Sequence, residues 1–292
     1  MEIIIARESG FCYGVKRALR LAREIRQQEN SRVYTWGELI HNPAVIKELQ
    51  EEDIIPSEDI NQLKGATVII RSHGVSPEIY ELLKSRARKV VDATCPIVKK
   101  IQQLTSRLAG QKLELIIVGN PNHPEIQGLL GTSQGKALIV ENESQVAALP
   151  PARRRAILAQ STQDRELFAR IVSLLVGKTQ ELRVYNTICR STQIRQQSTS
   201  ELATQVDVLL IIGGASSSNT TKLYEISRRI QPRTYFIEKA EQIKPEMLLG
   251  SRKIGISGGA STPPEAIQEA VIIIKKISQE SGREETTAPC PR

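Results

Sequence analysis

The chain has 292 residues, a hydrophobic share of 40% and a net charge of +8, which indicate a globular protein of two or three domains with an anionic partner. No apolar run reaches the roughly 20 residues of a membrane-spanning helix, and aromatic residues, on which single-stranded nucleic acids stack, make up only 3%. Charge alone leaves nucleic acid, a phosphorylated small molecule and an acidic protein open as partners.

The predicted elements alternate between strands and helices along the chain. Strands are expected at Glu2–Ala6, Val33–Trp36, Thr67–Arg71, Val90–Ala93, Glu114–Gly119, Ala137–Val140, Ala156–Ala159, Val208–Gly213, Thr234–Ile237 and Lys253–Ser257, and helices at Gly14–Glu29, Pro77–Ala87, Pro96–Leu108 and Pro263–Ile277. This order predicts an α/β fold with mostly parallel sheets and functional loops at the carboxyl ends of strands. The strand at the start leaves no room for a leader peptide, so the cytoplasm is the expected location.

Three cysteines occupy similar places in this pattern. Cys12, Cys95 and Cys189 lie roughly 80–95 residues apart, and each precedes a predicted helix. A helix amino end stabilises an anion, so all three sites favour the thiolate that binds metal. Any one of them alone is equally well explained as a small buried hydrophobic residue. Their repetition favours an iron–sulfur cluster with three protein ligands and one open iron, which indicates catalysis.

The three histidines also lie in loops. His73 and His123 each follow a predicted strand, and His41 lies beside Asn42-Pro43. Histidine can donate hydrogen bonds to phosphate, move protons or bind metal, and three of three in such loops favours function over structure. Glu125, two residues after His123, is the best candidate for a proton donor, although a carboxylate in a first helical turn is common for structural reasons.

Small polar residues follow three further strands. Hydroxyl groups and helix amino ends form good phosphate sites, and together these runs favour an oxyanion pocket. Each run taken singly is also explained as an ordinary helix cap. The runs are Gln160-Ser161-Thr162, Gly213-Gly214-Ala215-Ser216-Ser217-Ser218-Asn219 and Gly258-Gly259-Ala260-Ser261-Thr262.

With these motifs in order, the chain from about residue 1 to 280 resembles the 4-hydroxy-3-methylbut-2-enyl diphosphate reductase family. That family catalyses the last step of the non-mevalonate isoprenoid pathway. It reductively dehydrates an allylic alcohol diphosphate to isopentenyl and dimethylallyl diphosphates. The resemblance rests on Gly10-Phe11-Cys12-Tyr13-Gly14-Val15, His41-Asn42, Ser72-His73-Gly74-Val75, Asp92-Ala93-Thr94-Cys95-Pro96, His123-Pro124-Glu125, Gln160-Ser161-Thr162, the Cys189 segment, Ser217-Ser218-Asn219 and Gly259-Ala260-Ser261.

The resemblance implies a role for each matching residue. Cys12, Cys95 and Cys189 would hold a 4Fe–4S cluster whose open iron takes the substrate hydroxyl. Catalytic roles fall to Glu125, which would deliver the proton that lets water leave, and to His123 and Thr162. Substrate-binding roles around the diphosphate fall to His41, His73, His123, Ser161, Ser217, Ser218, Asn219 and Ser261. A ferredoxin or flavodoxin would donate electrons.

The resemblance also implies three small α/β lobes with mostly parallel sheets around a central iron–sulfur cluster. Their expected bounds are 14–95, 96–189 and 190–280, with the strand in 1–13 joining the third lobe and a disordered tail at 281–292. Cys290, in that tail, is not expected to be a ligand.

Two segments depart from the family pattern, and two other functions remain open. Leu129 stands where the family usually has Thr, and Arg190-Ser191-Thr192-Gln193 deviates from its commoner Ala-Thr pattern. A non-redox hydro-lyase also uses a three-cysteine cluster and would need no reductant. A cluster-based sensor that binds RNA would show salt-sensitive affinity, but the chain has no recognition motif for RNA.

Overall fold

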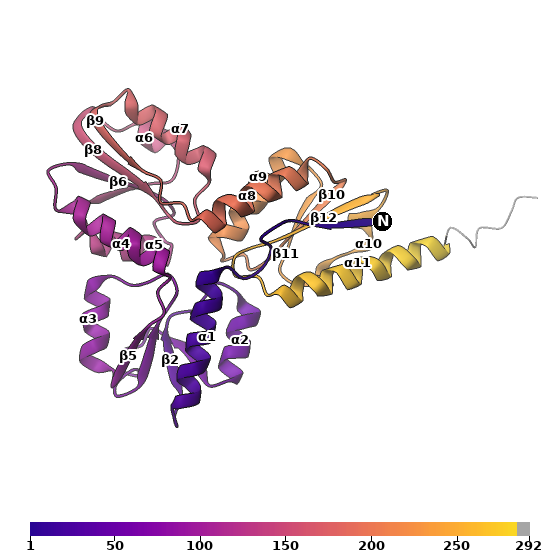
Figure 1. Ribbon diagram of the computed structural model, residues 1–292, viewed down its shortest axis with the longest axis horizontal. Coiled ribbons are helices and arrows are strands. Elements are labelled where there is room, and N and C mark those ends of the chain that lie inside the picture. Colours follow the sequence, from indigo (N-terminus) through magenta and orange to yellow (C-terminus); the bar gives the residue numbers. More distant parts are fainter. Residues whose placement is uncertain (285–292) are drawn as a thin grey trace, which may run out of the picture. The chain divides into compact units, whose positions relative to one another are not determined.

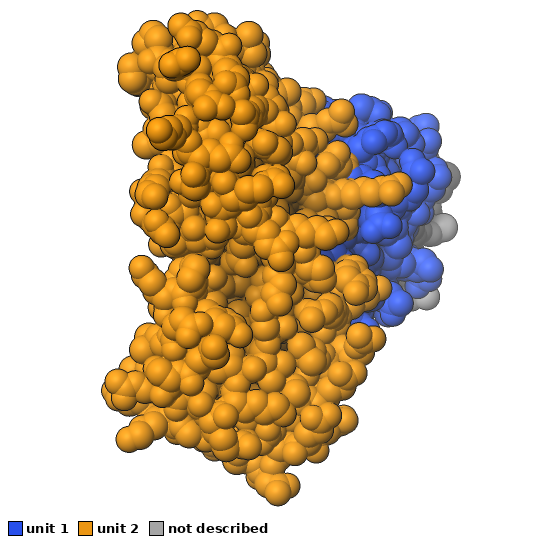
Figure 2. All heavy atoms as spheres, turned by 60° about the vertical axis from the view of Figure 1, so that its left-hand side comes forward, with its two compact units in different colours: residues 1–12, 194–292 blue, residues 13–193 orange. Residues whose placement is uncertain are grey.

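The computed structural model describes residues 1–284, with side chains through Glu280, and its three sheets each contain four parallel strands (Figure 1). The chain forms two compact units, a smaller one of residues 1–12 with 194 onward and a larger one of residues 13–193 (Figure 2). The α/β class and the parallel sheets predicted from the sequence are confirmed. Among the described residues, no helix has the length and apolar character needed to cross a membrane.

The first sheet of the larger unit has the strand order β3-β2-β4-β5. The central strands β2 and β4 pair in parallel, with Trp36 opposite Ile70 at their carboxyl ends. All four residues of β4 are buried, as expected for a central strand covered on both faces. The elements are α1 (Tyr13–Gln28), β2 (Val33–Trp36), α2 (Pro43–Glu51), β3 (Ile54–Ser57), β4 (Thr67–Ile70), α3 (Pro77–Arg86) and β5 (Lys89–Asp92).

The second sheet of the larger unit repeats this arrangement with the order β7-β6-β8-β9. Its central strands β6 and β8 place Val118 opposite Ala159 at their carboxyl ends. The elements are α4 (Pro96–Ala109), β6 (Glu114–Val118), α5 (Pro124–Thr132), β7 (Ala137–Val140), α6 (Glu143–Ala147), β8 (Ala152–Ala159), α7 (Arg165–Val176) and β9 (Thr179–Tyr185).

The third sheet, in the smaller unit, joins the two ends of the chain. Its order is β1-β12-β10-β11, and β1 pairs with β12 so that Ile5 lies opposite Ile256. The elements are β1 (Glu2–Ile5), α8 (Arg190–Ala203), β10 (Val208–Ile212), α9 (Ser218–Ile230), β11 (Thr234–Ile237), the 3₁₀ helix η1 (Ala240–Gln242), α10 (Pro245–Leu248), β12 (Lys253–Gly258) and α11 (Pro264–Glu284). If β1 is counted after β12, all three sheets have the same order.

Local sequence signals fix where several helices begin. The side chain of Asn42 accepts a hydrogen bond from the backbone N–H of Val45 at the start of α2, and Ser217 does the same for Thr220 in α9. Proline occupies the first turn of α2, α3, α4 and α5, where its missing N–H costs no helical hydrogen bond. Consequently the loop residues before these helices keep their places at the carboxyl edges of the sheets.

All ten predicted strands are present within one or two residues except β8, which begins four residues before the expected Ala156. Two edge strands were missed. β3 contains Pro56, which is tolerated at a sheet edge but argues against a strand, and β9 is rich in polar residues. Helix α11 runs through Glu284, past the expected start of the tail at residue 281. The rest of that tail, with Cys290, lies outside the described residues.

Candidate active site

The predicted site residues gather at equivalent positions of the three sheets. In each sheet the two central strands lead to helices that cross in opposite directions, and open α/β sheets bind ligands at such a switch point. His41, His123 and the Ser217–Asn219 run follow the first central strands β2, β6 and β10. The second central strands β4, β8 and β12 lead to His73, Ser161-Thr162 and Ser261.

The cysteines follow a third strand in every sheet. Cys95 comes after β5, Cys189 after β9 and Cys12 after β1, and each of these strands lies at a sheet edge next to the second central strand. All three cysteines are free thiols of intermediate exposure, and each directly precedes a helix. The repeat of one cysteine per module that the sequence indicated is thus matched by the topology.

In the larger unit the three histidines form one cluster. The rings of His41 and His73 are stacked with centroids 4.3 Å apart, and the ring of His123 lies edge-on to both, at 5.3 Å from each. One ring nitrogen from each residue lies within 4.8 Å of the others. The Nδ1 atom of His73 is buried and has no hydrogen-bond partner among the described residues. The cluster therefore presents ring nitrogens that a ligand can engage.

Burial favours the neutral form of all three imidazoles. Burial lowers the pKa of His123 to about 3 and that of His73 well below its usual value. Burial also lowers the pKa of His41, although the Glu38 carboxylate, 3.3 Å from its Nδ1 atom, partly opposes the shift. His123 Nδ1 accepts a hydrogen bond of 3.1 Å from the backbone N–H of Glu125, so the proton of the neutral ring is on Nε2. That N–H is a donor available to an anion.

Glu125 is fully buried beside this cluster, and among the described residues Ser161 is the hydrogen-bond partner of its carboxyl group. Ser161 donates to its carboxyl group twice, from the backbone N–H at 2.7 Å and from the hydroxyl at 2.6 Å. Burial raises the pKa of Glu125, and the two hydrogen bonds from Ser161 reduce this rise because they favour the ionised form. A carboxyl group whose pKa lies above its usual range is suited to give up a proton near neutral pH.

Backbone hydrogen bonds tie two cysteines to the loops that carry these groups. The N–H of Cys95 donates to the carbonyl of Ser72, and the N–H of Cys189 donates to the carbonyl of Ser161, each at 2.9 Å. Ser72, next to His73, also donates its N–H and its hydroxyl to the carbonyl of Leu39. The positions of the cysteines are therefore coupled to those of the histidine cluster and the Glu125 carboxyl group.

In the smaller unit the remaining predicted residues also lie together. The hydroxyl of Ser261 donates to that of Ser217 at 3.3 Å, and the N–H of Cys12 donates to the carbonyl of Ala260 at 3.0 Å. Asn219 is only 3% exposed, and neither its side-chain nitrogen nor its side-chain oxygen has a partner among the described residues. Since buried amides are nearly always hydrogen-bonded, this one indicates a place for a polar ligand. Ser218 begins α9 beside it.

Five of the helix amino ends at the candidate site lack the acidic residue that often occupies a first turn. Of the described α-helices, α1, α2, α4, α8 and α9 have none, whereas the other six each have one. The five helices without one follow the predicted cysteines, His41 or Ser217. Their partial positive charges thus remain available to an anion.

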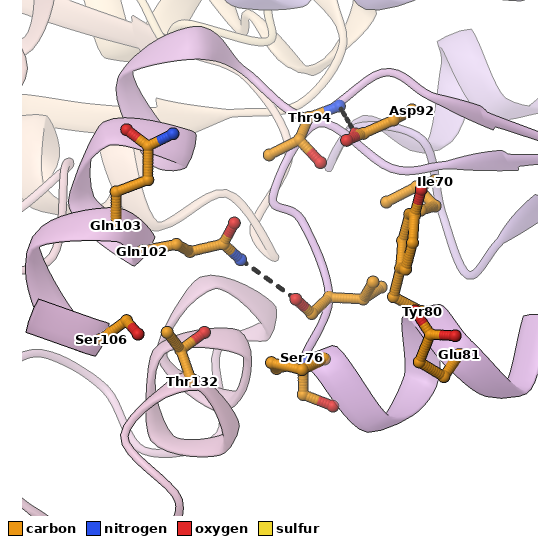
Figure 3. A pocket seen from close by; sticks show the side chains of 12 residues that line it. Ile70, Ser76, Tyr80, Glu81, Asp92, Thr94, Gln102, Gln103, Ser106 and Thr132 are labelled. Carbon is orange, nitrogen blue, oxygen red and sulfur yellow. Dashed lines mark hydrogen bonds between the residues drawn. The ribbon is translucent and has the colours of Figure 1, made fainter. Parts of the chain in front are cut away.

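A pocket of about 300 Å³ lies elsewhere in the larger unit, bordered by α3, α4 and α5 (Figure 3). None of the predicted site residues lines it. One residue of its wall stabilises the loop that carries His73. The Gln102 side chain donates a hydrogen bond of 3.1 Å to the carbonyl of Val75 in that loop (Figure 3). Gly74 in this loop has a φ of +73°, and a Cβ there would lie 2.8 Å from the Gln102 amide.

Several residues at the site were missed or doubted in the sequence. Arg71 was expected to be the last residue of a strand and was given no role at the site. It instead directly follows β4, and its side chain is only 15% exposed. Arg195 is buried and donates to the carbonyl of Gly10 at 2.8 Å, ahead of Cys12. Thr162 is hydrogen-bonded to the side chain of Gln160, and Leu129 is buried in the apolar core, so its departure from the family pattern removes no polar contact.

Comparison with known proteins identifies the family. The model described as "LytB protein" matches residues 3–275. The chain belongs to the LytB protein family. Among its LytB relatives, the 4-hydroxy-3-methylbut-2-enyl diphosphate reductase of Aquifex aeolicus is 42% identical over 282 residues, covering 96% of this chain and 98% of the relative. The reductase of the same name from Caldanaerobacter subterraneus is 42% identical over 288 residues, covering 97% of this chain and 100% of the relative.

Two solved structures agree with the LytB assignment. One, described as the terminal enzyme of the non-mevalonate pathway, shares 42% identity with a TM-score of 0.69, and the match covers 94% of this chain and all of that one. The other, a diphosphate reductase from Plasmodium falciparum, shares 30% identity with a TM-score of 0.88, covering 93% of this chain and 87% of that one. The family expected from the motifs is therefore confirmed.

Proposed function

We propose that this LytB chain reductively dehydrates 4-hydroxy-3-methylbut-2-enyl diphosphate to isopentenyl and dimethylallyl diphosphates. The observation that carries the proposal is the histidine cluster next to the buried Glu125, in a chain 42% identical to relatives named as this reductase. The cluster offers donors for a diphosphate, and Glu125 offers a proton for the departing oxygen.

The diphosphate is bound by neutral donors and helix amino ends. His123 donates from Nε2, and His41 and His73 supply further ring nitrogens from the same cluster. Ser217, Ser218, Asn219 and Ser261 form the second group of polar side chains. Several fixed donors around one end of a substrate orient its reacting bond, which lowers the entropic part of the barrier.

Glu125 protonates the hydroxyl oxygen that leaves as water. Its burial keeps the carboxyl group protonated to a higher pH than usual. After the proton has moved, the N–H and hydroxyl of Ser161 stabilise the resulting carboxylate by hydrogen bonds. Ser161 and Thr162 occupy the loop after β8 where the family places two hydroxyl side chains. His123, whose Nδ1 atom holds the first turn of α5, fixes the position of Glu125 in that turn.

Cys12, Cys95 and Cys189 hold a 4Fe–4S cluster in this proposal. Three free thiols at helix amino ends without first-turn carboxylates form a donor set that fits such an anionic group. When bound, the cluster supplies electrons and a Lewis-acidic iron for the hydroxyl oxygen. Free thiols also fit a reducing compartment, so the cytoplasm is the proposed location.

The electron donor is an acidic one-electron carrier of the ferredoxin or flavodoxin kind. The first two turns of α1 carry Lys16, Arg17 and Arg20 without an acidic residue, and they begin directly after Cys12. Arg17 donates to the carbonyl of Thr94, beside Cys95, so this cationic stretch lies next to a second ligand as well. Opposite charge steers an acidic partner toward such a surface.

Anaerobic turnover tests the function. Reconstituted protein with measured iron and sulfide is mixed with the allylic diphosphate and a strong small-molecule reductant, and the products are analysed. Reductant-dependent formation of both five-carbon diphosphates is expected. Turnover without reductant would instead indicate a hydro-lyase, and a cluster-loaded protein that forms no product but binds RNA in a salt-sensitive manner would indicate a sensor.

A further inference from the structure

Arg71 lies at the switch point of the first sheet and has no role in the proposed chemistry. It directly follows β4, two residues before His73, while Gly37 follows β2 and Glu58 follows β3. The Nη1 atom of Arg71 donates to Glu58 at 3.0 Å. The guanidinium group thus spans the carboxyl ends of the strands whose loops carry His41 and His73.

The structure keeps this guanidinium group buried but incompletely paired. Its side chain is 15% exposed, and its Nε atom is buried without a hydrogen-bond partner among the described residues. Gly37, with a φ of +65°, leaves room for it, since a Cβ there would lie 2.4 Å from Nη1. A buried cation with an unsatisfied donor is costly, so its retention indicates an anionic ligand that completes its bonds.

The charges around the histidine cluster also favour an anionic ligand beside Arg71. Burial lowers the pKa of all three imidazoles, and the positive charge of Arg71 lowers it further, so both favour the neutral rings. A diphosphate that enters among neutral rings brings several negative charges into a desolvated place. The opposing carboxylates are Glu58, which is 57% exposed, and Glu38, which contacts His41. Arg71 is the buried side chain here that carries a permanent positive charge.

We propose that Arg71 is a further substrate-binding residue, which supplies the fixed positive charge for the diphosphate at the histidine cluster. Glu58 is the counter-ion of Arg71 before substrate binds, and the diphosphate replaces Glu58 as the hydrogen-bond acceptor when it binds. This inference rests on the proposed function, because it assumes that a diphosphate binds at the cluster. It concerns substrate affinity and leaves the proton and electron steps to other residues.

The test uses the cluster-loaded enzyme and inorganic diphosphate as the probe, measured by anaerobic titration calorimetry and as a competitive inhibitor of turnover. Arg71→Gln should weaken probe binding by about 10- to 100-fold, the range of one charge-assisted contact, and raise KM far more than it lowers kcat. Arg71→Lys should recover part of the affinity because it keeps the charge but loses the planar fork.

Glu58→Gln is the control that separates a binding role from a structural one. If Arg71 binds the ligand, Glu58→Gln leaves affinity unchanged or tightens it, because it frees the guanidinium group and removes a negative charge. If the pair only holds the loops together, both variants weaken binding alike, which overturns the proposal, as does an Arg71→Gln enzyme with wild-type affinity. Wild-type enzyme that binds no diphosphate, or binds it independently of His73, overturns the diphosphate site and the role of Arg71 together.

Discussion

Ser161 holds both oxygens of the Glu125 carboxyl group, one through its backbone N–H and the other through its hydroxyl. The two residues are 36 positions apart: Ser161 lies in the loop after β8, and Glu125 lies in the first turn of α5, the helix that follows the neighbouring strand β6. Burial raises the pKa of Glu125 and so favours its protonated form. The two hydrogen bonds from Ser161 favour the ionised form and oppose this rise, so the two effects act on the proton of Glu125 in opposite directions.

Ser161→Ala should shift the pH dependence of turnover. The hydroxyl bond lowers the pKa of Glu125, so its loss raises that pKa further and moves the alkaline limb of the kcat profile to higher pH. A hydrogen bond to a charged group contributes about 1.5–3 kcal/mol, so kcat at neutral pH should fall by roughly 10- to 100-fold. The measurement is a pH–rate profile with the small-molecule reductant.

Ser161→Thr is the matched control, since it keeps the hydroxyl and the backbone donor. It should retain the profile and most of the rate. A Ser161→Ala enzyme with an unshifted alkaline limb would show that this limb does not report Glu125.

Glu125→Gln should abolish most turnover while leaving ligand binding intact. The amide has the shape of the carboxyl group but cannot transfer a proton, so kcat should fall by about 10²–10⁴-fold, the usual range for a general acid. Iron and sulfide content and affinity for inorganic diphosphate should stay within a few-fold of wild type. Near-normal turnover would remove Glu125 from the proton step.

His123 should make the protein less stable in mild acid. The pKa of His123 is about 3 in the folded protein and close to 6.5 in the unfolded chain, so only the unfolded state gains a proton between these values. The free energy of unfolding therefore falls as pH drops below about 6.5, by about 1.4 kcal/mol per pH unit for this one proton. Urea unfolding at pH 5 to 7 measures the slope.

His123→Asn isolates this effect because asparagine is a good helix cap and can still accept the N–H of Glu125. The variant should lose stability less steeply with falling pH, whereas at pH 7 the two proteins should differ little. Equal slopes would mean that His123 is protonated in the folded state. Glu125 contributes with the opposite sign, since its raised pKa makes the folded state retain a proton longer.

Replacing Asn219 by an apolar residue should stabilise the fold but weaken ligand binding. Both polar atoms of its buried side chain lack partners among the described residues, and an unsatisfied buried group costs about 1–3 kcal/mol. Asn219→Leu, similar in size, should therefore raise the free energy of unfolding while weakening the binding of inorganic diphosphate. A variant that is both destabilised and unimpaired in binding would show that the amide serves the fold.

The basic start of α1 should matter only with a protein electron donor. Lys16→Glu with Arg20→Glu should slow turnover with an acidic ferredoxin by about tenfold or more at low salt, and the difference should narrow as salt rises. Turnover with a small viologen should not change. Lys112→Glu with Arg153→Glu, on exposed residues at the amino ends of the second sheet, is the control. Equal loss in both pairs would exclude a specific docking face on α1.

The positions of most candidate site residues could be predicted from the sequence because these residues lie where strands end and helices begin. Cys95 precedes Pro96 and follows a β-branched run, so the strand end, the cysteine and the helix start are visible together. His73 and the Ser217–Asn219 run follow equally clear strands. Since the parallel strands of one sheet all end at the same edge, each of these residues is expected at the carboxyl edge of its own sheet.

What the sequence did not predict depends on packing between distant segments. The environment of Arg71 depends on Glu58, which follows the edge strand β3. That strand was not predicted because it contains Pro56. The neutrality of the histidines depends on burial by the loops of two sheets, which no local pattern records. Likewise the pairing of Glu125 with Ser161 joins the first turn of α5 to the loop after β8 and has no local signature of its own.

The place of β1 sets the order in which the protein can mature. β1 is made first but pairs only with β12, so residues 2–5 have no partner in the sheet until about residue 256 has been synthesised. Cys12 is likewise held by the carbonyl of Ala260. Because a ribosome releases the chain from the amino end, one of the three thiols stays unplaced through almost all of translation. In the proposed function, a cluster held by all three cysteines would therefore be completed only after about residue 260 has been synthesised.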